Sequence, residues 1–167
     1  VDEAHCISQW GYDFRPSYLQ IAEIRESKPK TPILALTATA TKEVVKDIQE
    51  KLIFKKENII QKSFKRANLA YMVLEENHKT DRVQKMLHKI KGSAIVYVRS
   101  RKKAQEFSIK LNKLGINSLH YHGALSYDER HIHYKKWMNN EVRVMVATNA
   151  FGMGIDKPDV RLVIHLQ

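Results

Sequence analysis

Two adjacent carboxylates lie in the run Val1-Asp2-Glu3-Ala4-His5. Paired acids at the tip of a buried strand suit Mg²⁺-nucleotide chemistry, because one carboxylate can hold the metal while its neighbour polarises the attacking water. We expect Asp2 to orient Mg²⁺, Glu3 to position or deprotonate the water, and His5 to link the γ-phosphate site to a neighbouring domain. The alternative interpretation is a surface acidic turn.

The phosphate-gripping loop that would complete such a site is not found in these residues. The 167 residues contain no G-x-x-x-x-G-K-[ST] run, whose amides and lysine hold the β- and γ-phosphates. We therefore expect this loop either to precede Val1 in a longer polypeptide or not to exist. The chain alone is then expected to bind ATP poorly and to have no meaningful ATPase activity.

The composition indicates a folded, basic protein. Hydrophobic residues make up 43% and charged residues 28% of the chain, close to globular averages. Lys+Arg 29 against Asp+Glu 18 gives a formal charge of +11, which favours a polyanionic partner such as nucleic acid. Each basic cluster alone is explained equally well as a solvated face. No apolar run reaches the roughly 18 residues of a membrane span, so we expect no membrane partner and an intracellular location.

The single cysteine, Cys6, excludes an internal disulfide. A lone thiol beside an acidic motif could act as a nucleophile, but a small buried packing residue is the favoured interpretation.

Extended apolar runs alternate with amphipathic segments of helical length, which is the pattern of a parallel sheet covered by helices. We therefore predict an α/β fold. The predicted strands are residues 33–36, 59–63, 70–74, 94–97, 118–120, 143–147 and 162–165. The predicted helices are residues 17–26, 42–52, 80–91, 102–114 and 127–139. Residues typical of helix starts and ends support these bounds: Thr41, Asp81, Ser126, Gly92 and Gly115.

A basic stretch at residues 63–70 separates two strand-like runs with no helix between them, so we predict a domain linker there. Residues 71–167 hold a nearly complete βαβ series, whereas residues 1–62 hold only a few elements. A partial sheet leaves apolar faces and strand edges uncovered, so self-association of the chain is an expected consequence.

The segment from Ser8 to Tyr18 is rich in aromatic and polar residues without apolar periodicity. Exposed rings can stack on unpaired bases with about 1–3 kcal/mol per base and no sequence preference. We expect Trp10, Phe14 and Arg15 to contact single-stranded nucleic acid. The alternative is that the two rings anchor a core.

Hydroxyls and basic groups follow several predicted strands. We call Asp2-Glu3-Ala4-His5 the acidic box. Thr37 and Thr39 end one predicted strand, and we expect their hydroxyls to exchange hydrogen-bond partners with the acidic box. An ordinary Thr-rich helix cap explains the same residues. Ser100 and Arg101 stand at a helix start, where amides and side chains can hold a nucleic-acid phosphate. His122 is expected either to contact the nucleic-acid backbone or to bond a local carbonyl.

A second polar turn follows the strand predicted at residues 143–147. Thr148 is expected to contact nucleic acid there. Gly152 and Gly154 would let the backbone approach a nucleotide closely, and Asp156 would hold a ribose hydroxyl or an arginine.

Four segments, taken in order, resemble the helicase core of RecQ-family ATP-dependent DNA helicases of superfamily 2. They are DEAH at residues 2–5, CISQWGYDFRP at 6–16, LTATA at 36–40 and ATNAFGMGIDKP at 147–158. The sequence departs from the family pattern at Tyr12, where His is common, and at Gly123-Ala124, where Ala-Gly is usual.

The resemblance implies RecA-like parallel sheets flanked by helices, with an incomplete first domain at residues 1–62 and a nearly complete second domain at 71–167. It implies a motor that uses ATP and Mg²⁺, moves along single-stranded DNA and opens duplex junctions during DNA repair and recombination. Its aromatic-rich loop couples single-strand contact to ATP hydrolysis. The implied location is the cytoplasmic nucleoid of a bacterium or the nucleus of a eukaryote.

The resemblance also implies an arginine finger, a side chain that neutralises charge on the transition state of ATP hydrolysis. In this family it lies in the motif that follows the one at residues 147–158, so we expect it beyond Gln167. A non-catalytic, basic nucleic-acid-binding module is the main alternative function. A superfamily 2 RNA helicase is a third possibility, disfavoured because the aromatic loop is not typical of that group.

Overall fold

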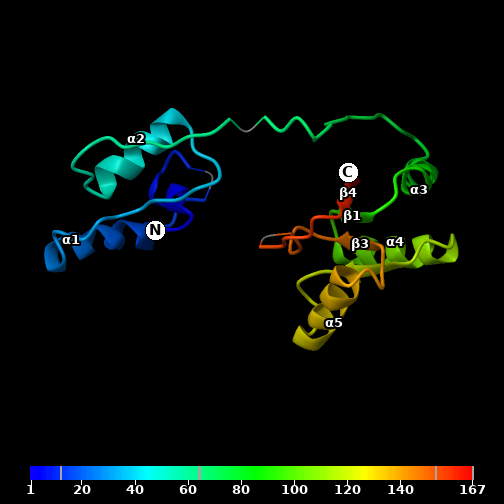
Figure 1. Ribbon diagram of the computed structural model, residues 1–167. Coiled ribbons are helices and arrows are strands. Elements are labelled where there is room, and N and C mark those ends of the chain that lie inside the picture. The colour runs from blue at the N-terminus through cyan, green and yellow to red at the C-terminus, as the bar shows by residue number, and fades with distance from the viewer. Residues whose placement is uncertain (12, 64, 153, 167) are drawn as a thin grey trace. The chain divides into compact units, whose positions relative to one another are not determined.

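The computed structural model describes residues 1–11, 13–63, 65–152 and 154–166. Contacts divide the chain into two compact units, Val1–Ala70 and Tyr71–Gln167. Figure 1 shows the helices and strands of each unit. By this division the predicted linker at residues 63–70 falls within the first unit.

A four-stranded sheet organises the second unit. The strands are β1 (Ser93–Val98), β2 (Ser118–Tyr121), β3 (Val144–Ala147) and β4 (Val160–Leu166). Their order is β2-β3-β1-β4 and every neighbouring pair is parallel, which confirms the predicted α/β fold. The central strands β1 and β3 are almost wholly buried, as parallel strands covered on both faces must be. The edge strand β4 alternates between half-buried and exposed residues.

Helices cover both faces of this sheet (Figure 1). The helices are α3 (Lys79–Lys89), α4 (Arg101–Lys113) and α5 (Tyr127–Met138). Successive strand residues point to opposite faces. Ala94 and Val96 therefore pack with α3 and α4, whereas Ile95 packs with Trp137 of α5.

The signals that begin and end these helices act as the sequence predicted. Ser126 and Glu129 form a reciprocal capping box at the start of α5. Gly92 and Gly115 follow α3 and α4 with φ values of 98° and 76°, a region that favours glycine.

The first unit consists of short helices around a small core. Its elements are η1 (Ala4–Ile7), η2 (Pro16–Glu23), α1 (Ile24–Ser27) and α2 (Lys42–Lys51). Ala4 and Ile7 pack there against Val44, Ile48 and Leu52. The α-helix predicted at residues 17–26 is instead mostly 3₁₀. Tyr18 and Ile21 pack against the core of this unit, but no residue of the segment is fully buried, so little packing favours a regular α-helix.

Three predicted strands do not form regular strands. In the segment 33–36, the Val1 amine donates to the Leu34 carbonyl at 2.7 Å and the Leu36 amide donates to the Val1 carbonyl at 2.8 Å. This is the parallel pattern, and the Ala4 amide adds a bond to the Leu36 carbonyl at 2.9 Å, but the segments do not form a regular ladder. Segments 59–63 and 70–74 are irregular and exposed, because no strand among the described residues pairs with them.

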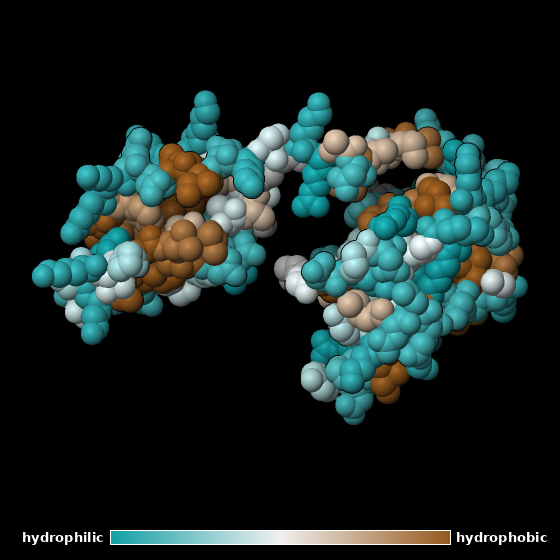
Figure 2. Space-filling model, in the orientation of Figure 1, coloured by the Kyte–Doolittle hydropathy of each residue, from teal (hydrophilic) through white to brown (hydrophobic). Residues whose placement is uncertain are grey.

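Apolar side chains remain exposed on the first unit, where Figure 2 shows them in brown. Leu34, Ile53 and Ile60 have exposed fractions of 68%, 57% and 90%.

In the described part of the chain, no helix is long and apolar enough to cross a bilayer.

Replacing Leu111 by Ala is expected to lower the free energy of unfolding by about 2–5 kcal/mol, because this fully buried side chain of α4 would leave a cavity. Urea unfolding followed by circular dichroism measures the loss. Ile109→Ala on the same helix is the matched control, since Ile109 is half exposed and should change stability by about 0.5 kcal/mol or less. Equal losses in both variants would contradict the packing described here.

Candidate functional site

The paired carboxylates of the acidic box are both exposed. The Asp2 side chain accepts a hydrogen bond from the Glu3 amide at 2.9 Å. Glu3 has φ 47° and ψ 42°, a left-handed conformation that a non-glycine residue adopts rarely and that is found disproportionately at functional sites. Oxygen donors on two exposed adjacent carboxylates are the ligands that Mg²⁺ prefers, so these residues fit the metal implied by the sequence.

His5 is buried and connects the acidic box to the Thr37 segment. Its Nδ1 lies 2.8 Å from Thr37 Oγ1 and 3.3 Å from a carboxylate oxygen of Glu3. Thr37 Oγ1 in turn donates to the Thr39 carbonyl at 3.3 Å. Nδ1 of the His5 ring therefore faces both a hydroxyl and a carboxylate. The structure brings Glu3, His5 and Thr37 together, and Thr39 meets them through its backbone.

The loop after the acidic box presents one large ring to solvent. Trp10 is 75% exposed, whereas Phe14 is half-buried. Arg15 is exposed and forms an ion pair with Asp13 at 2.5 Å, which lowers the pKa of the Asp13 carboxyl. Tyr12 lies outside the described residues. Trp10 is therefore not a core residue, and its ring is accessible to a ligand.

Glycine is required at position 11 by a close approach of the backbone. A Cβ there would lie 2.6 Å from the His5 carbonyl oxygen. The loop thus folds tightly back onto the helical turn η1, and the Arg15 amide bonds the Cys6 carbonyl at 2.8 Å.

A buried polar contact anchors the start of this loop to α2. Ser8 Oγ donates to Asp47 at 2.7 Å and accepts from the Trp10 amide at 3.2 Å. The hydrogen bond from Ser8 lowers the pKa of Asp47, and the hydrogen bond and charge of Lys51 lower it further. The sequence reasoning missed this pair. The only available signal was an acid and a lysine four residues apart on one helix, which is common on solvated faces.

In the second unit, basic and polar groups surround a cavity of about 540 Å³ where β1 and β3 end. Its lining residues are Arg99, Ser100, Arg101, Lys102, Gly123, Thr148, Asn149 and Ala150. The cavity thus brings together three predicted nucleic-acid residues, Ser100, Arg101 and Thr148. Ser100 also caps α4 by accepting from the Lys103 amide at 3.2 Å, which leaves its hydroxyl proton able to donate. Lys102 and Asn149 were not predicted, although they are next to predicted residues.

A second cavity, of about 590 Å³, lies beside the first and shares Arg99 and Asn149 with it. Tyr97 and His165 stack there with ring centroids 5.0 Å apart. Gly152 lines this cavity with φ 133°, and a Cβ on it would lie 2.6 Å from the Tyr97 hydroxyl. The close approach that requires glycine is therefore to a side chain of the protein itself.

The other two nucleotide-binding candidates, Gly154 and Asp156, are exposed and are not among the described residues that line either cavity. The residue after them, Lys157, is buried. Its Nζ donates to Asp159 and Asn140 at 2.8 Å each, and it lies 5.3 Å from the Trp137 ring centroid. Lys157 thus fixes the end of the segment that began at Thr148.

His122 belongs to a group of three histidines. The ring of His120 lies 5.4 Å from the rings of both His122 and His133. His133 Nδ1 bonds the His120 carbonyl at 2.8 Å, whereas His122 Nδ1 is buried with no hydrogen-bond partner among the described residues. The choice between a nucleic-acid contact and a local carbonyl for His122 stays a prediction.

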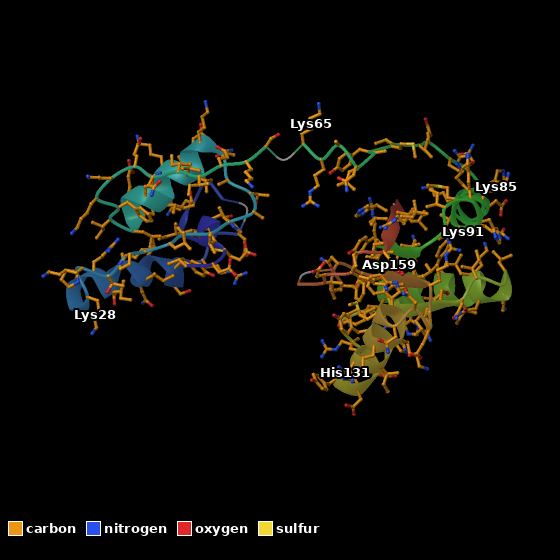
Figure 3. All side chains as sticks on the ribbon, viewed as in Figure 1. Lys28, Lys65, Lys85, Lys91, His131 and Asp159 are labelled. Carbon is orange, nitrogen blue, oxygen red and sulfur yellow. The ribbon has the colours of Figure 1, made fainter. Side chains whose placement is uncertain are left out.

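Other basic side chains are dispersed. Lys28, Lys65, Lys85 and Lys91 are exposed, and Figure 3 shows them at separate places along the chain. Three basic residues, Arg99, Arg101 and Lys102, line the first cavity, while these four lysines lie on solvated surface.

Comparison with known proteins assigns the chain to a family. Residues 78–167 match the family model of the helicase conserved C-terminal domain. This match covers more than half of the 167 residues, and the chain belongs to that helicase family.

Relatives that match over the whole chain are more specific. The sequence is 44% identical to ATP-dependent DNA helicase RecQ of Bacillus subtilis, over 100% of this chain and 29% of the relative. It is 43% identical to RecQ-like DNA helicase blm-1 of Caenorhabditis elegans, over 99% of this chain and 17% of the relative. The assignment to the RecQ family is thereby confirmed. The chain spans less than a third of the length of these relatives.

The fold is shared more widely. A Saccharomyces cerevisiae Dbp5 structure matches with a TM-score of 0.71 at 22% identity, over 99% of this chain and 42% of that chain. At this identity the likeness concerns the fold alone. It agrees with the parallel, helix-covered sheet of the second unit, which is the RecA-like fold expected from the sequence.

His120 is expected to titrate below its ordinary pKa of 6.5, because burial, then His133 and then His122, disfavours its charged form, while Glu129 opposes them. At a pH just below 6.5, the histidine of the unfolded chain is then protonated more often than His120 of the folded chain. Stability should therefore fall as the pH drops through the folded pKa of His120. NMR titration of the imidazole and urea unfolding across this range measure both effects.

The control is His133→Gln, which removes one neighbouring charge and should raise the pKa of His120. A His120 that titrates at or above 6.5 in the unmodified chain would contradict the arrangement of this histidine group.

Proposed function

We propose that the chain acts as part of an ATP-dependent DNA helicase, which couples ATP hydrolysis to movement along single-stranded DNA and to duplex unwinding. The observation that carries the proposal is the cavity lined by Arg99, Ser100, Arg101 and Lys102 at the start of α4 and by Thr148 after β3. Polar side chains from separate parallel strands meet there around a space large enough for a phosphate and its sugar.

The chemistry of this cavity suits a nucleic-acid backbone. The amides at the start of α4 and the cations of Arg101 and Lys102 attract a phosphate, and the Ser100 and Thr148 hydroxyls can donate to its oxygens. Backbone contacts carry no sequence information, as a motor that moves along any strand requires. The buried, unpartnered Nδ1 of His122, one residue before Gly123 of the cavity, is a further group able to bond the strand.

In the first unit we propose that Trp10 stacks on an unpaired base while Arg15 and Phe14 hold the loop around it. The exposed fraction of Trp10 supports this role, since stacking requires an accessible face. The ion pair with Asp13 positions Arg15 and is available for exchange with a DNA phosphate.

We propose that Asp2 would hold Mg²⁺ and Glu3 would orient and deprotonate the water that attacks ATP. Bound Mg²⁺ would neutralise charge on the phosphates. The contacts of His5 with Glu3 and Thr37 support a role in which the acidic box and the Thr37 segment respond to nucleotide together. Gly152, Gly154 and Asp156 are proposed to contact the nucleotide or an arginine.

Residues 1–62 and 71–167 are proposed to belong to two successive RecA-like domains joined by residues 63–70. The exposed apolar side chains of the first unit favour self-association of this chain in isolation. We also infer that the 167 residues alone do not hydrolyse ATP in a DNA-stimulated manner. The alternative function is a non-catalytic, basic nucleic-acid-binding module, because exposed lysines are dispersed over the chain.

Arg101→Ala is expected to weaken binding of the chain to single-stranded DNA and to reduce the slope of log K against log salt by about 0.7, the value of one lost phosphate contact. Fluorescence anisotropy with a labelled oligonucleotide at several salt concentrations measures both. Lys113→Ala, at the other end of α4, removes the same charge away from the cavity and should leave the slope nearly unchanged. Identical losses in both variants would favour diffuse surface attraction.

Glu3→Gln, in a helicase polypeptide of the relatives' length that carries these residues, is expected to lower ATP hydrolysis about 10²-fold or more while ATP binding persists, because only proton transfer and water orientation are lost. Single-turnover hydrolysis and nucleotide titration separate the two effects. Glu57→Gln, an exposed acid of the same unit, should change neither. Loss of Mg²⁺-ATP binding in Glu3→Gln would count against the proposed role.

A further inference from the structure

Three side chains with metal-binding atoms meet beneath the aromatic loop, and the proposed motor mechanism does not use them together. Cys6 Sγ lies 3.7 Å from His5 Nε2 and 3.7 Å from Asp13 Oδ2. All three ligand atoms lie within 4.8 Å of one another. Cys6 and His5 are buried, and Asp13 is half-buried at the surface.

These spacings agree with a tetrahedral metal centre. With a Zn–S bond of about 2.3 Å and a Zn–N bond of about 2.0 Å, the sulfur and nitrogen ligands of one tetrahedral ion lie about 3.5 Å apart. The observed separations of sulfur from the other two ligands exceed this value only slightly. The ligand atoms of His5 and Asp13 lie within 4.8 Å of each other and would have to approach to about 3.3 Å to share one tetrahedral ion.

The orientation of His5 also suits a metal. One ring nitrogen, Nδ1, faces Thr37 Oγ1 and Glu3, and the other, Nε2, faces Cys6. A hydroxyl or carboxylate that holds the far nitrogen of a ligand histidine fixes its tautomer and raises its basicity. The neighbours of His5 already supply that support.

Charge on the third ligand is compensated by a cation in the present arrangement. Asp13 Oδ2 accepts from Arg15 and from the Cys6 thiol. A metal ion would replace the Cys6 thiol proton and would compete with Arg15 for the carboxylate.

We propose that His5, Cys6 and Asp13 form a binding site for a thiolate-preferring divalent metal of the Zn²⁺ class, with a fourth position open toward solvent beside Asp13. This site is distinct from the Mg²⁺ position at Asp2, because a thiolate and an imidazole select zinc-like ions whereas carboxylate oxygens select Mg²⁺. The bound ion would link Asp13 of the aromatic loop to His5 of the acidic box and to Cys6 beside it. The proposal does not rest on the helicase function.

Cobalt titration tests the site directly. The chain has one cysteine, so any sulfur-to-Co²⁺ charge-transfer absorption reports on Cys6 alone. We expect one equivalent of Co²⁺ to produce that absorption together with the visible bands of a tetrahedral centre, and Zn²⁺ to abolish both. Cys6→Ala should remove the charge-transfer band.

Because Cys6→Ala removes a buried group, Asp13→Asn provides a second test at a half-exposed position with unchanged shape. It should weaken Co²⁺ binding at least about tenfold with the fold intact by circular dichroism. His88→Gln, which alters an exposed histidine of α3, is the matched control and should leave the titration unchanged. Absence of the charge-transfer band in the unmodified chain, or an affinity unaffected by Asp13→Asn, would overturn the proposal.

Discussion

The parallel register of β1 with its two neighbours is the constraint on which the second unit depends. Because β1 pairs in parallel with both β3 and β4, the carboxyl ends of all three strands meet at one edge of the sheet. The turns after β1 and β3, which contain Arg99 to Lys102 and Thr148 to Asn149, therefore line one cavity although they are almost fifty residues apart in the sequence. The helix α4 begins at that same edge, so its amide ends add to the positive potential there.

The first unit depends on polar contacts more than on a sheet. His5 and Ser8, both buried, reach Thr37 and Asp47 in segments more than thirty residues away. A buried polar group without a partner costs about 1–3 kcal/mol, so these contacts constrain how the acidic box, the Thr37 segment and α2 can be arranged. The Trp10 amide donates to the Ser8 hydroxyl. A displacement of Ser8 at the base of the loop would therefore also move the accessible Trp10 ring.

Much of this structure could be predicted from the sequence where local signals and packing agree. The strands of the second unit were predicted within one or two residues, because buried parallel strands form continuous apolar runs. The segments 59–63 and 70–74 carry the same kind of apolar residues but pair with no other strand, and strand formation depends on a neighbour that local sequence does not reveal. The predicted helix at residues 17–26 is largely 3₁₀, and Tyr18 and Ile21 contact the core only as partly buried residues.

The candidate sites show the same division. Ser100, Arg101 and Thr148 were predicted from their place after strands, because in a parallel sheet such positions converge. Cavity residues such as Tyr97 and His165 were not predicted, since their ring stacking joins two strands through tertiary structure alone. The contact of His5 with Cys6 and Asp13 was equally hidden, because it depends on how tightly the loop turns at Gly11.

The interior amine of Lys157 has a consequence for the segment between Thr148 and Asp156. At one end, the Thr148 amide bonds the Tyr121 carbonyl at 3.1 Å. At the other end, Lys157 is immobilised by Asp159, Asn140 and the Met138 carbonyl. Both ends are thus held to the sheet and to the end of α5, and Phe151 between them is buried against Trp137 of the same helix. A ligand that displaced this segment would therefore also disturb the packing of α5.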